Sequence, residues 1–171
     1  MTATQFPAWA AGQKITAAGL LQMERFFAFK PGATTVTSST TLADDPDLQI
    51  VLTGTGTFLL DGLILYSGAA TGTGDLKMQM NYTGTISSSN WTPMGVNVTS
   101  ATGSVNFFGP QFANPQSVGS DGSSITMAAR LGGYLVTSTT GTCKLQWAQN
   151  TSSATSTTVR AGSWLTLQQV A

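Results

Sequence analysis

Along most of this chain, hydrophobic and polar residues alternate one by one, which is the pattern of β-strands that bury one face. The alternation is clearest over 76–82, where Leu, Met, Met and Tyr are separated by Lys, Gln and Asn. It returns over 142–149, around Leu145 and Trp147. Thr, Val and Ile are frequent in these segments, and Gly, Asn and Ser separate one segment from the next. The chain after Pro31 is therefore predicted to be all-β.

The spacing of these segments predicts many short strands in one domain, which is typical of a jelly-roll-like β-sandwich. Segment 56–66 is the most continuously apolar, so we expect a central strand covered on both faces, with a bend or bulge at Asp61-Gly62. Polar, glycine-rich loops are expected at 68–75, 87–95, 109–124 and 149–158. The predicted strands are 33–41, 47–53, 56–66, 74–82, 95–100, 104–108, 123–130, 133–138, 142–149 and 163–170.

Residues 16–28 have helical spacing instead, with Leu20, Met23 and Phe27 on one stripe. Thr16 is a candidate N-cap, and Lys30-Pro31-Gly32 ends the pattern. We therefore expect an N-terminal arm of residues 1–30 that contains one short helix, followed by a β-sandwich domain of residues 31–171. The arm either packs on its own β domain or docks on a partner, as amphipathic helices often do. Its candidate docking residues are Phe6, Trp9, Leu20, Leu21, Met23, Phe26 and Phe27.

The composition narrows the function. The 171 residues include seven basic and seven acidic ones, no histidine and one cysteine. Without histidine, the chain lacks the commonest general base and the commonest metal ligand. One cysteine excludes zinc clusters and intrachain disulfides. A net charge of zero argues against nucleic-acid binding, which needs a basic surface. We expect a non-enzymatic protein without a cofactor.

The surface is expected to be weakly charged, because Ser and Thr together supply 45 residues. Such a surface suits a protein that sits in an assembly, and a trimer would cover the exposed sheet edges of a sandwich. No run of about 18 apolar residues exists, so no membrane-spanning helix is predicted. The N-terminal residues lack the order of a signal peptide, so we expect synthesis in a cytoplasm.

Asp44, Asp45 and Asp47 form the one acidic cluster. They would suit Ca²⁺, but the spacing does not match an EF-hand loop, so we favour a turn that enters a strand. Asp61 and Asp75 could serve glycoside hydrolysis only if the fold brought two acids together, and nothing in the sequence does so. Cys143 lies in a strand pattern and is predicted to be a small buried core residue.

The aromatic residues of the β region offer a second set of candidate contacts. Trp91 lies in a predicted polar loop, where it either contacts a subunit or a glycan, or folds back on the sandwich. Phe108 and Phe112 flank the start of the long loop at 109–124 and are further candidates for outer contacts. Trp147 and Trp164 lie in predicted strands, so we assign them to the core or to a subunit interface.

Four stretches of the chain resemble one protein family. The opening W-A-A-G-Q-K-I-T-A-A-G-L-L (Trp9–Leu21) and L-A-D-D-P-D-L (Leu42–Leu48) are two of them. The third runs from the strand ending L-I-L-Y-S-G to the G-D-L-K turn (Leu63–Lys77). The fourth and most specific is the segment from L-Q-W-A-Q-N to G-S-W-L-T-L (Leu145–Leu167). In these stretches the chain resembles small β-rich virion structural proteins of tailed phages, of the capsid decoration or minor tail type, especially those of actinobacteriophages.

The resemblance implies a non-enzymatic component of a virion that is assembled in the host cytoplasm, and a jelly-roll homotrimer. The first hypothesis is a capsid decoration protein whose arm docks on the major capsid protein and whose β domain projects outward. The alternative is a minor tail or tail-tip protein that contacts other tail proteins and the host surface through Trp91, Phe108 and Phe112. A carbohydrate-binding module, with Trp91 stacked on a host surface glycan, is a third hypothesis. A hydrolase is the least supported.

Overall fold

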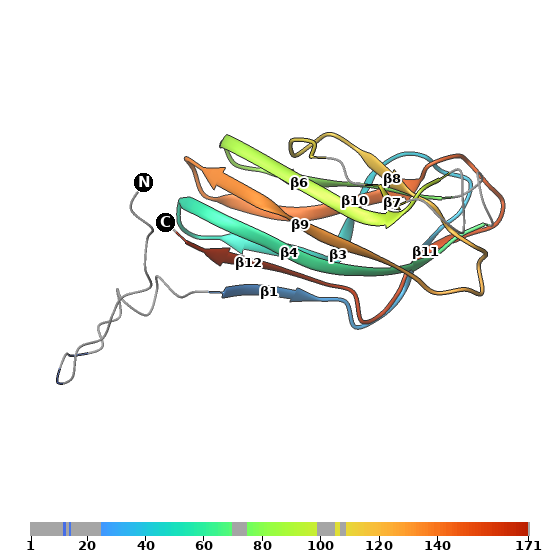
Figure 1. Ribbon diagram of the computed structural model, residues 1–171, viewed down its shortest axis with the longest axis horizontal. Helices are drawn as coiled ribbons and strands as arrows, with labels where there is room; N and C mark the ends of the chain where they lie inside the picture. Colours follow the sequence, from blue (N-terminus) through green and yellow to red (C-terminus); the bar gives the residue numbers. More distant parts are fainter. Residues whose placement is uncertain are drawn as a thin grey trace.

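The computed structural model describes residues 25–69, 75–98, 105–106 and 109–170, together with Gly12 and Lys14. Over these residues the protein is all-β, and two antiparallel sheets pack face to face as a sandwich (Figure 1). The predicted all-β sandwich is thus confirmed. Its strands reach from Arg25 to Gln169, so segments at the two ends of the described chain lie side by side.

The larger sheet has eight strands and runs in the order β1-β12-β4-β9-β6-β7, with β11 beside β4 and β2 beside β11. The ladder from β1 to β6 forms the broad sheet of Figure 1. Its strands are β1 (Arg25–Phe29), β2 (Thr34–Val36), β4 (Gly56–Ser67), β6 (Ile86–Val96), β7 (Val105–Asn106), β9 (Met127–Thr137), β11 (Thr157–Val159) and β12 (Trp164–Gln169).

The smaller sheet has four strands in the order β3-β10-β5-β8. These are β3 (Ala43–Leu52), β5 (Leu76–Tyr82), β8 (Gln116–Val118) and β10 (Gly141–Gln149). Strands β5 and β10 are those with the clearest alternation in the sequence, and their Met78 and Trp147 pair across the ladder. From β3 to β10 the chain passes repeatedly between the two sheets, and both sheets turn their apolar positions inward.

The core lies between the sheets. Trp91, Phe58 and Tyr66 are its largest side chains from the large sheet, and each is at most 1% exposed. The facing side chains of the small sheet include Leu48, Ile50, Met78, Met80, Leu145 and Trp147. Burial alternates along most strands, because successive side chains of a strand point to opposite faces.

The predicted helix over 16–28 is wrong in its last part. Residues 25–28 belong to β1, which pairs with β12 with Phe27 opposite Thr166. Residues 16–24 lie outside the described part. The helical interpretation failed because 26–29 is apolar on both faces: Phe26 and Ala28 turn toward the core, while Phe27 and Phe29 stay exposed. A strand with two apolar faces has no period-two signal. Residues 25–29, assigned to the arm from the sequence, are therefore part of the sandwich.

The predicted loop at 87–95 is also wrong, since it forms most of β6. Ser88, Asn90 and Thr92 face outward, whereas Ser89, Trp91, Pro93 and Gly95 are buried. Pro93 is opposite Leu131 of β9, and the ladder with β7 reaches only Gly95 and Val96. The missing N–H of Pro93 is tolerated at such an edge.

The predicted strands 123–130 and 133–138 are a single strand, β9. The glycine pair Gly132-Gly133 does not break it, and pairing with β4 and β6 continues through both residues. A Cβ at Gly133 would lie 2.2 Å from the carbonyl oxygen of Asn90. Glycine therefore serves the close approach of β6 to β9 rather than a turn.

Strand β4 is central, as predicted, but the bulge and the cover on both faces are wrong. Its pairing with β12 and β9 runs without a register shift through Asp61 and Gly62, so no bulge occurs there. A Cβ at Gly62 would lie 2.7 Å from Leu165 Cδ2, so packing against β12 accounts for this glycine. The strand is not covered on both faces either, since Leu59 is 48% exposed.

Candidate functional site

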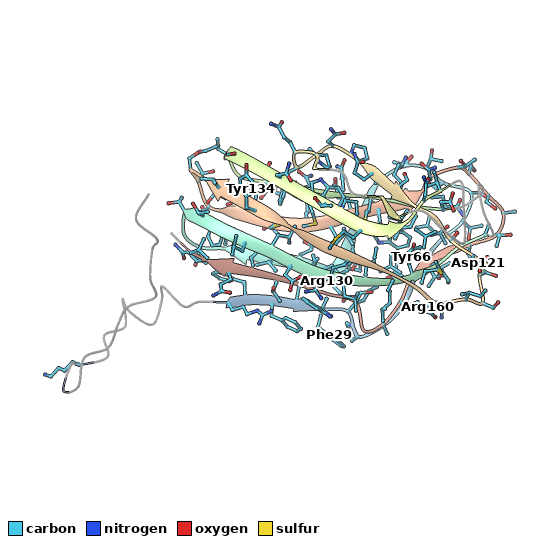
Figure 2. The ribbon with its side chains drawn as sticks, viewed as in Figure 1. Phe29, Tyr66, Asp121, Arg130, Tyr134 and Arg160 are labelled. Atoms are coloured by element: carbon cyan, nitrogen blue, oxygen red, sulfur yellow. The ribbon has the colours of Figure 1, made fainter. Side chains whose placement is uncertain are left out.

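The outer face of the large sheet carries an unusual group of exposed aromatic and apolar side chains. Phe27 is 60% exposed, Phe29 50%, Leu59 48% and Tyr134 38%. We call this surface the aromatic face. Phe29, Arg130 and Tyr134, three of its members, are labelled in Figure 2. The aromatic face consists of Arg25, Phe27, Phe29, Leu59, Asp61, Arg130, Tyr134 and Trp164.

Strand register explains why these residues meet. Phe29 of β1 pairs with Trp164 of β12, which pairs with Leu63 of β4, which in turn pairs with Arg130 of β9. Paired residues of neighbouring strands point to the same side of a sheet. Positions two residues away form the next rows, so β1, β12, β4 and β9 together build one surface.

The rings of the aromatic face pack on one another. Phe27 stacks on Phe29 with ring centroids 6.4 Å apart, and on Trp164 at the same distance. The Arg130 guanidinium lies over the Trp164 ring, with Cζ 5.4 Å from the centroid. Cation–π contacts of this kind stabilise an exposed pair by about 0.5–1 kcal/mol. The rings are thus held in place without being covered.

One ion pair and one shallow depression complete this surface. Arg130 pairs with Asp61 at 2.7 Å, and both side chains are more than a third exposed. The depression, of about 380 Å³, is lined by Arg25, Phe27, Phe29 and Trp164. Aromatic and arginine side chains are enriched at protein interfaces, whereas Lys and Glu are depleted there. The aromatic face has that composition.

The outer face of the small sheet is different. We call it the amide face; it consists of Asp44, Gln49, Lys77, Gln79, Asn81, Lys144 and Gln146. Gln79 Nε2 donates to Gln146 Oε1, and Lys144 forms an ion pair with Asp44. Val51, 63% exposed, is an apolar exception at the edge of this face. On this solvated face Gln79, Gln146, Asp44 and Lys144 bond to one another, whereas Lys77 and Gln49 donate to backbone carbonyl groups.

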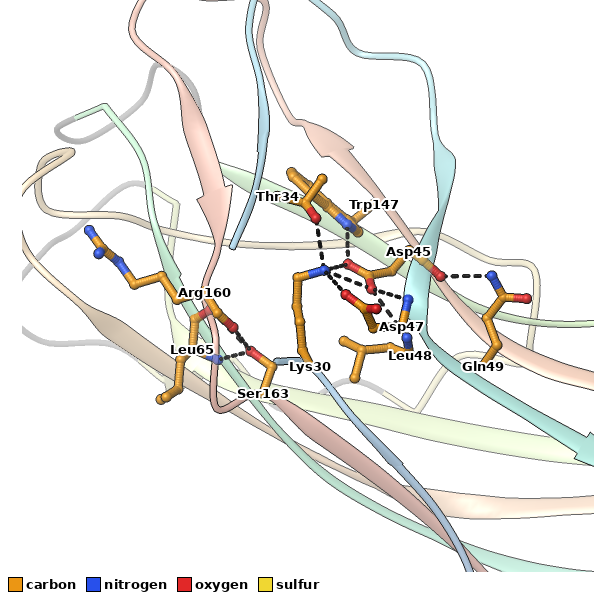
Figure 3. Close-up of polar contacts among 10 residues, drawn as sticks. All are labelled: Lys30, Thr34, Asp45, Asp47, Leu48, Gln49, Leu65, Trp147, Arg160 and Ser163. Atoms are coloured by element: carbon orange, nitrogen blue, oxygen red, sulfur yellow. Dashed lines mark hydrogen bonds and ion pairs between the residues drawn. The ribbon is translucent and has the colours of Figure 1, made fainter. Parts of the chain in front are cut away.

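A buried lysine lies where the two sheets meet. Lys30 directly follows β1 and is fully buried, and its Nζ is 2.9 and 3.0 Å from the two carboxylate oxygens of Asp45 (Figure 3). The same ammonium group donates to Thr34 Oγ1 at 2.8 Å and to Asp47 Oδ2 at 3.0 Å. Asp45 also accepts the indole N–H of Trp147. The ammonium group thus has a partner for each of its three donors.

Backbone contacts fix both sides of this pair. The Lys30 N–H donates to Ser163 O, and Gly162 N–H donates to Lys30 O. The N–H groups of Asp47 and Leu48 donate to Asp45 Oδ1 at 3.0 and 3.2 Å. This Asp turn is set into β3 at a register shift, where Asp44 pairs with Gln146 but Gln49 pairs with Lys144. We name Lys30, Thr34, Asp45, Asp47 and Trp147 the lysine cluster.

The three carboxylates of the predicted acidic cluster therefore pair with two lysines: Asp45 and Asp47 with Lys30, and Asp44 with Lys144. The favoured turn is present at Asp45, but it lies within β3 rather than before a strand. Lys144 lowers the pKa of Asp44 through their hydrogen bond. In the part of the chain that the structure describes, no group of three or more Asp, Glu, Cys or His residues is placed to hold a metal ion. The geometry favours ion pairing over the Ca²⁺ alternative.

Two of the three predicted outer contacts are not exposed. Trp91 is fully buried in β6, and its indole N–H donates to Gln111 O. Phe112 is also buried, with its N–H on Ser89 Oγ. The predictions of exposed contacts at Trp91 and Phe112 are therefore both wrong, and for one reason. Residues 109–112 fold back along β6, where the Trp91 backbone N–H donates to Pro110 O. Phe108 lies outside the described residues.

The predicted docking residues divide in a similar way. Phe26 packs edge-to-face on Phe58 at 6.2 Å, so it serves the core rather than a partner. Phe27 is exposed, but on a strand rather than on a helix. Phe6, Trp9, Leu20, Leu21 and Met23 lie outside the described residues. Phe29 and Lys30 were not among the predicted site residues, because both were placed in the N-terminal arm and Lys30 was interpreted as part of the signal that ends a helix.

The remaining chemical candidates have structural roles. Asp61 is on the aromatic face, whereas Asp75 is buried and accepts the N–H of Ser120, so the fold does not join them as a pair. Cys143 is buried as predicted, and burial raises the pKa of its thiol to about 12. Burial also raises the pKa of the Tyr66 hydroxyl, which donates to Gly119 O.

In the comparison with known proteins, no family model and no curated protein matches the chain. Within the described ranges, no helix is long and apolar enough to cross a membrane. The aromatic face, the amide face and the lysine cluster are therefore the features of the described residues that bear on function.

Proposed function

We propose that this protein is a non-enzymatic structural subunit of a tailed-phage virion, and that it decorates the capsid. The observation that supports this proposal is the aromatic face, an exposed surface of aromatic, apolar and arginine side chains on a sandwich whose other outer face is polar. A contiguous exposed apolar surface is a mark of protein–protein contact. The resemblance of four sequence stretches to virion proteins agrees with an assembly role.

In this proposal the protein is a homotrimer, and the aromatic face lies between its copies. Eight strands, β3 to β10, supply sheet orders β3-β10-β5-β8 and β4-β9-β6-β7, which is consistent with a jelly roll formed from two Greek keys. The large sheet extends beyond that unit through β12 and β1. These two added strands contribute Phe27, Phe29 and Trp164, so the extension builds the contact surface.

The arm that docks on the major capsid protein is then limited to residues 1–24, because β1 belongs to the sandwich. A protein that binds only the assembled shell stabilises it by mass action. The amide face would be turned toward solvent, since its polar groups are already paired and lose nothing by remaining exposed.

The copy number per particle tests the proposal. Purified particles are digested, and this protein is quantified against the major capsid protein by mass spectrometry with labelled peptides. A capsid decoration protein is expected at about one copy per copy of the major capsid protein, or at one trimer per local three-fold position of the shell. A handful of copies per particle would instead assign it to the tail, and absence from particles would overturn the virion proposal.

A sugar-binding function retains one specific observation. Trp91 no longer supports it, but the depression lined by Arg25, Phe27, Phe29 and Trp164 offers aromatic rings beside a cation. Binding of a host surface glycan to the monomer, lost in Trp164→Ala and kept in Trp91→Phe, would favour this second candidate. A glycan array without signal for the wild-type protein would exclude it.

A further inference from the structure

The lysine cluster has the parts that amide formation requires. We infer that Lys30 and Asp45 form an intramolecular isopeptide bond after the chain folds, and that Asp47 relays the protons. The reacting pair is fully buried, and Nζ lies 2.9 and 3.0 Å from the two oxygens bonded to Asp45 Cγ. Nucleophile and carbon are thus held near the contact distance of about 3–3.5 Å from which such reactions proceed.

Burial favours the reaction over a permanent ion pair. Two charges inside a protein keep a large desolvation penalty, which only excellent geometry offsets. Condensation removes both charges, because an ammonium and a carboxylate become a neutral amide and water. Fixing the two groups in one site corresponds to an effective concentration of roughly 10⁵–10⁸ M, which raises the rate and shifts the equilibrium toward the amide.

Asp45 carries donors at the position where negative charge develops. The N–H groups of Asp47 and Leu48 both point at Oδ1, at 3.0 and 3.2 Å. Two backbone donors on one oxygen form an oxyanion hole, which stabilises the tetrahedral intermediate of acyl transfer. In the product, Oδ1 becomes the amide oxygen and keeps both hydrogen bonds. The indole N–H of Trp147 lies 3.0 Å from Oδ2, the oxygen that leaves.

Asp47 supplies the proton path. Its Oδ2 is 3.0 Å from Lys30 Nζ, and its side chain is 32% exposed. The bond from Nζ to Cγ forms, and the bond from Cγ to Oδ2 breaks. The Lys30 ammonium group loses two protons, and Asp47 transfers them to Oδ2 of Asp45. That oxygen of Asp45 then departs as water. The total charge of Lys30 and Asp45 is zero before and after, and Asp47 ends as the carboxylate it began as.

The bond would join the two sheets covalently. Lys30 follows the edge strand β1 of the large sheet, and Asp45 lies in the edge strand β3 of the small one. These strands are neighbours at one side of the sandwich and carry no other covalent link, since the single cysteine, Cys143, is free. The cross-link would prevent the edge strand β1 from separating from the sandwich, and it would thereby keep Phe27 and Phe29 on the aromatic face.

The intact mass of the folded full-length chain tests this inference. The protein is expected to be lighter than its sequence by one water molecule. Chymotrypsin cuts after aromatic residues and leucine, so cleavage after Phe29, Leu42 and Leu48 is expected to release two peptides that remain joined through Lys30 and Asp45. A folded protein with its full sequence mass would overturn the inference. So would a water loss that maps to Asp61-Gly62 or Asp121-Gly122, where aspartate cyclises with its own backbone.

Two variants separate the reaction from the fold. Asp47→Asn removes the relay at a partly exposed position, and it is expected to fold with an unchanged circular dichroism spectrum but to keep its full mass. Asp44→Asn is the matched control, since that neighbouring carboxylate pairs with Lys144 instead, and it is expected to form the bond as completely as the wild type. Equal cross-linking in both variants would overturn the role of Asp47. A mass loss in Lys30→Arg would overturn the assignment of the nucleophile.

Discussion

The two outer faces of this sandwich are built on the same kind of ladder but carry opposite chemistry. On the amide face, Gln79, Gln146 and Asp44 satisfy one another, and Lys144 neutralises Asp44. On the aromatic face, the exposed rings of Phe27 and Phe29 stack on each other, and Phe27 also stacks on the partly buried Trp164, beside the Arg130 guanidinium. Folding alone accounts for the first face, which behaves as an ordinary solvated sheet surface.

The difference is the basis of our proposal that the aromatic face serves association rather than folding. Exposed rings add little to the stability of a single chain, because they bury little area when the chain folds. Their benefit appears when a second surface covers them. In the proposed homotrimer that second surface is another copy of the chain, and copies without net charge do not repel one another.

The largest expected effect contrasts an inner and an outer tryptophan. Trp91→Ala is expected to lower the free energy of unfolding by about 3–5 kcal/mol, because it opens a cavity beneath β6. Trp164→Ala is expected to lower it by less, about 1–2 kcal/mol, because the Trp164 ring is only partly buried and also loses its contact with Arg130. Both are measured by urea unfolding in a Phe27→Ser, Phe29→Ser background, so that association does not contribute. Equal losses would mean that the aromatic face belongs to the core energetically.

A second variant moves the chemistry of one face to the other. Lys77→Phe with Gln79→Phe places two rings at alternate positions of β5, as Phe27 and Phe29 stand on β1. Each phenylalanine that becomes buried between copies contributes about 1.5–3 kcal/mol, so the variant is expected to form open-ended aggregates. Light scattering against concentration measures this. A variant that associates no more than the wild type would show that exposed rings alone do not create a contact.

The smallest effect concerns pH on the amide face. Lys144 lowers the pKa of Asp44 in the folded state, so this pair stabilises the fold fully above the ordinary aspartate pKa of 3.8. That stability is lost as the pH falls through the lower folded pKa. An exposed pair of this kind contributes about 0.2–1 kcal/mol. The unfolding free energy of Asp44→Asn is expected to approach that of the wild type as the pH is lowered from 6 to about 2. A constant difference across that range would contradict the ion-pair account.

Sequence patterns predicted the strands whose two faces differ. β5 and β10 alternate cleanly and were placed within two residues of their bounds. β1 failed because Phe26 and Phe29 are apolar on opposite faces. β6 failed because its buried face carries Ser89, Pro93 and Gly95 beside Trp91 and so shows no apolar alternation. Both strands depend on long-range pairing, with β12 and β9, that local pattern does not report.

The sites were predicted less well for the same reason. Trp164 was assigned to the core or to an interface, and it lies on the aromatic face. Its neighbours Phe27 and Arg130 are distant in sequence and become adjacent only through strand register. Lys30 was interpreted as the end of a helix because Pro31 and Gly32 follow it. Its ion-pair partner, Asp45, lies in the other sheet and gives no local signal.

Sedimentation equilibrium of the purified full-length protein tests the central claim most directly, namely that copies of this chain meet through the aromatic face. The wild type is expected at three times the chain mass, and Phe27→Ser with Phe29→Ser at one chain mass with an unchanged circular dichroism spectrum. The control, Lys77→Ser with Gln79→Ser on the amide face, is expected to remain a trimer. A wild-type protein that stays at one chain mass at all concentrations, or a double variant of β1 that stays trimeric, would contradict the account.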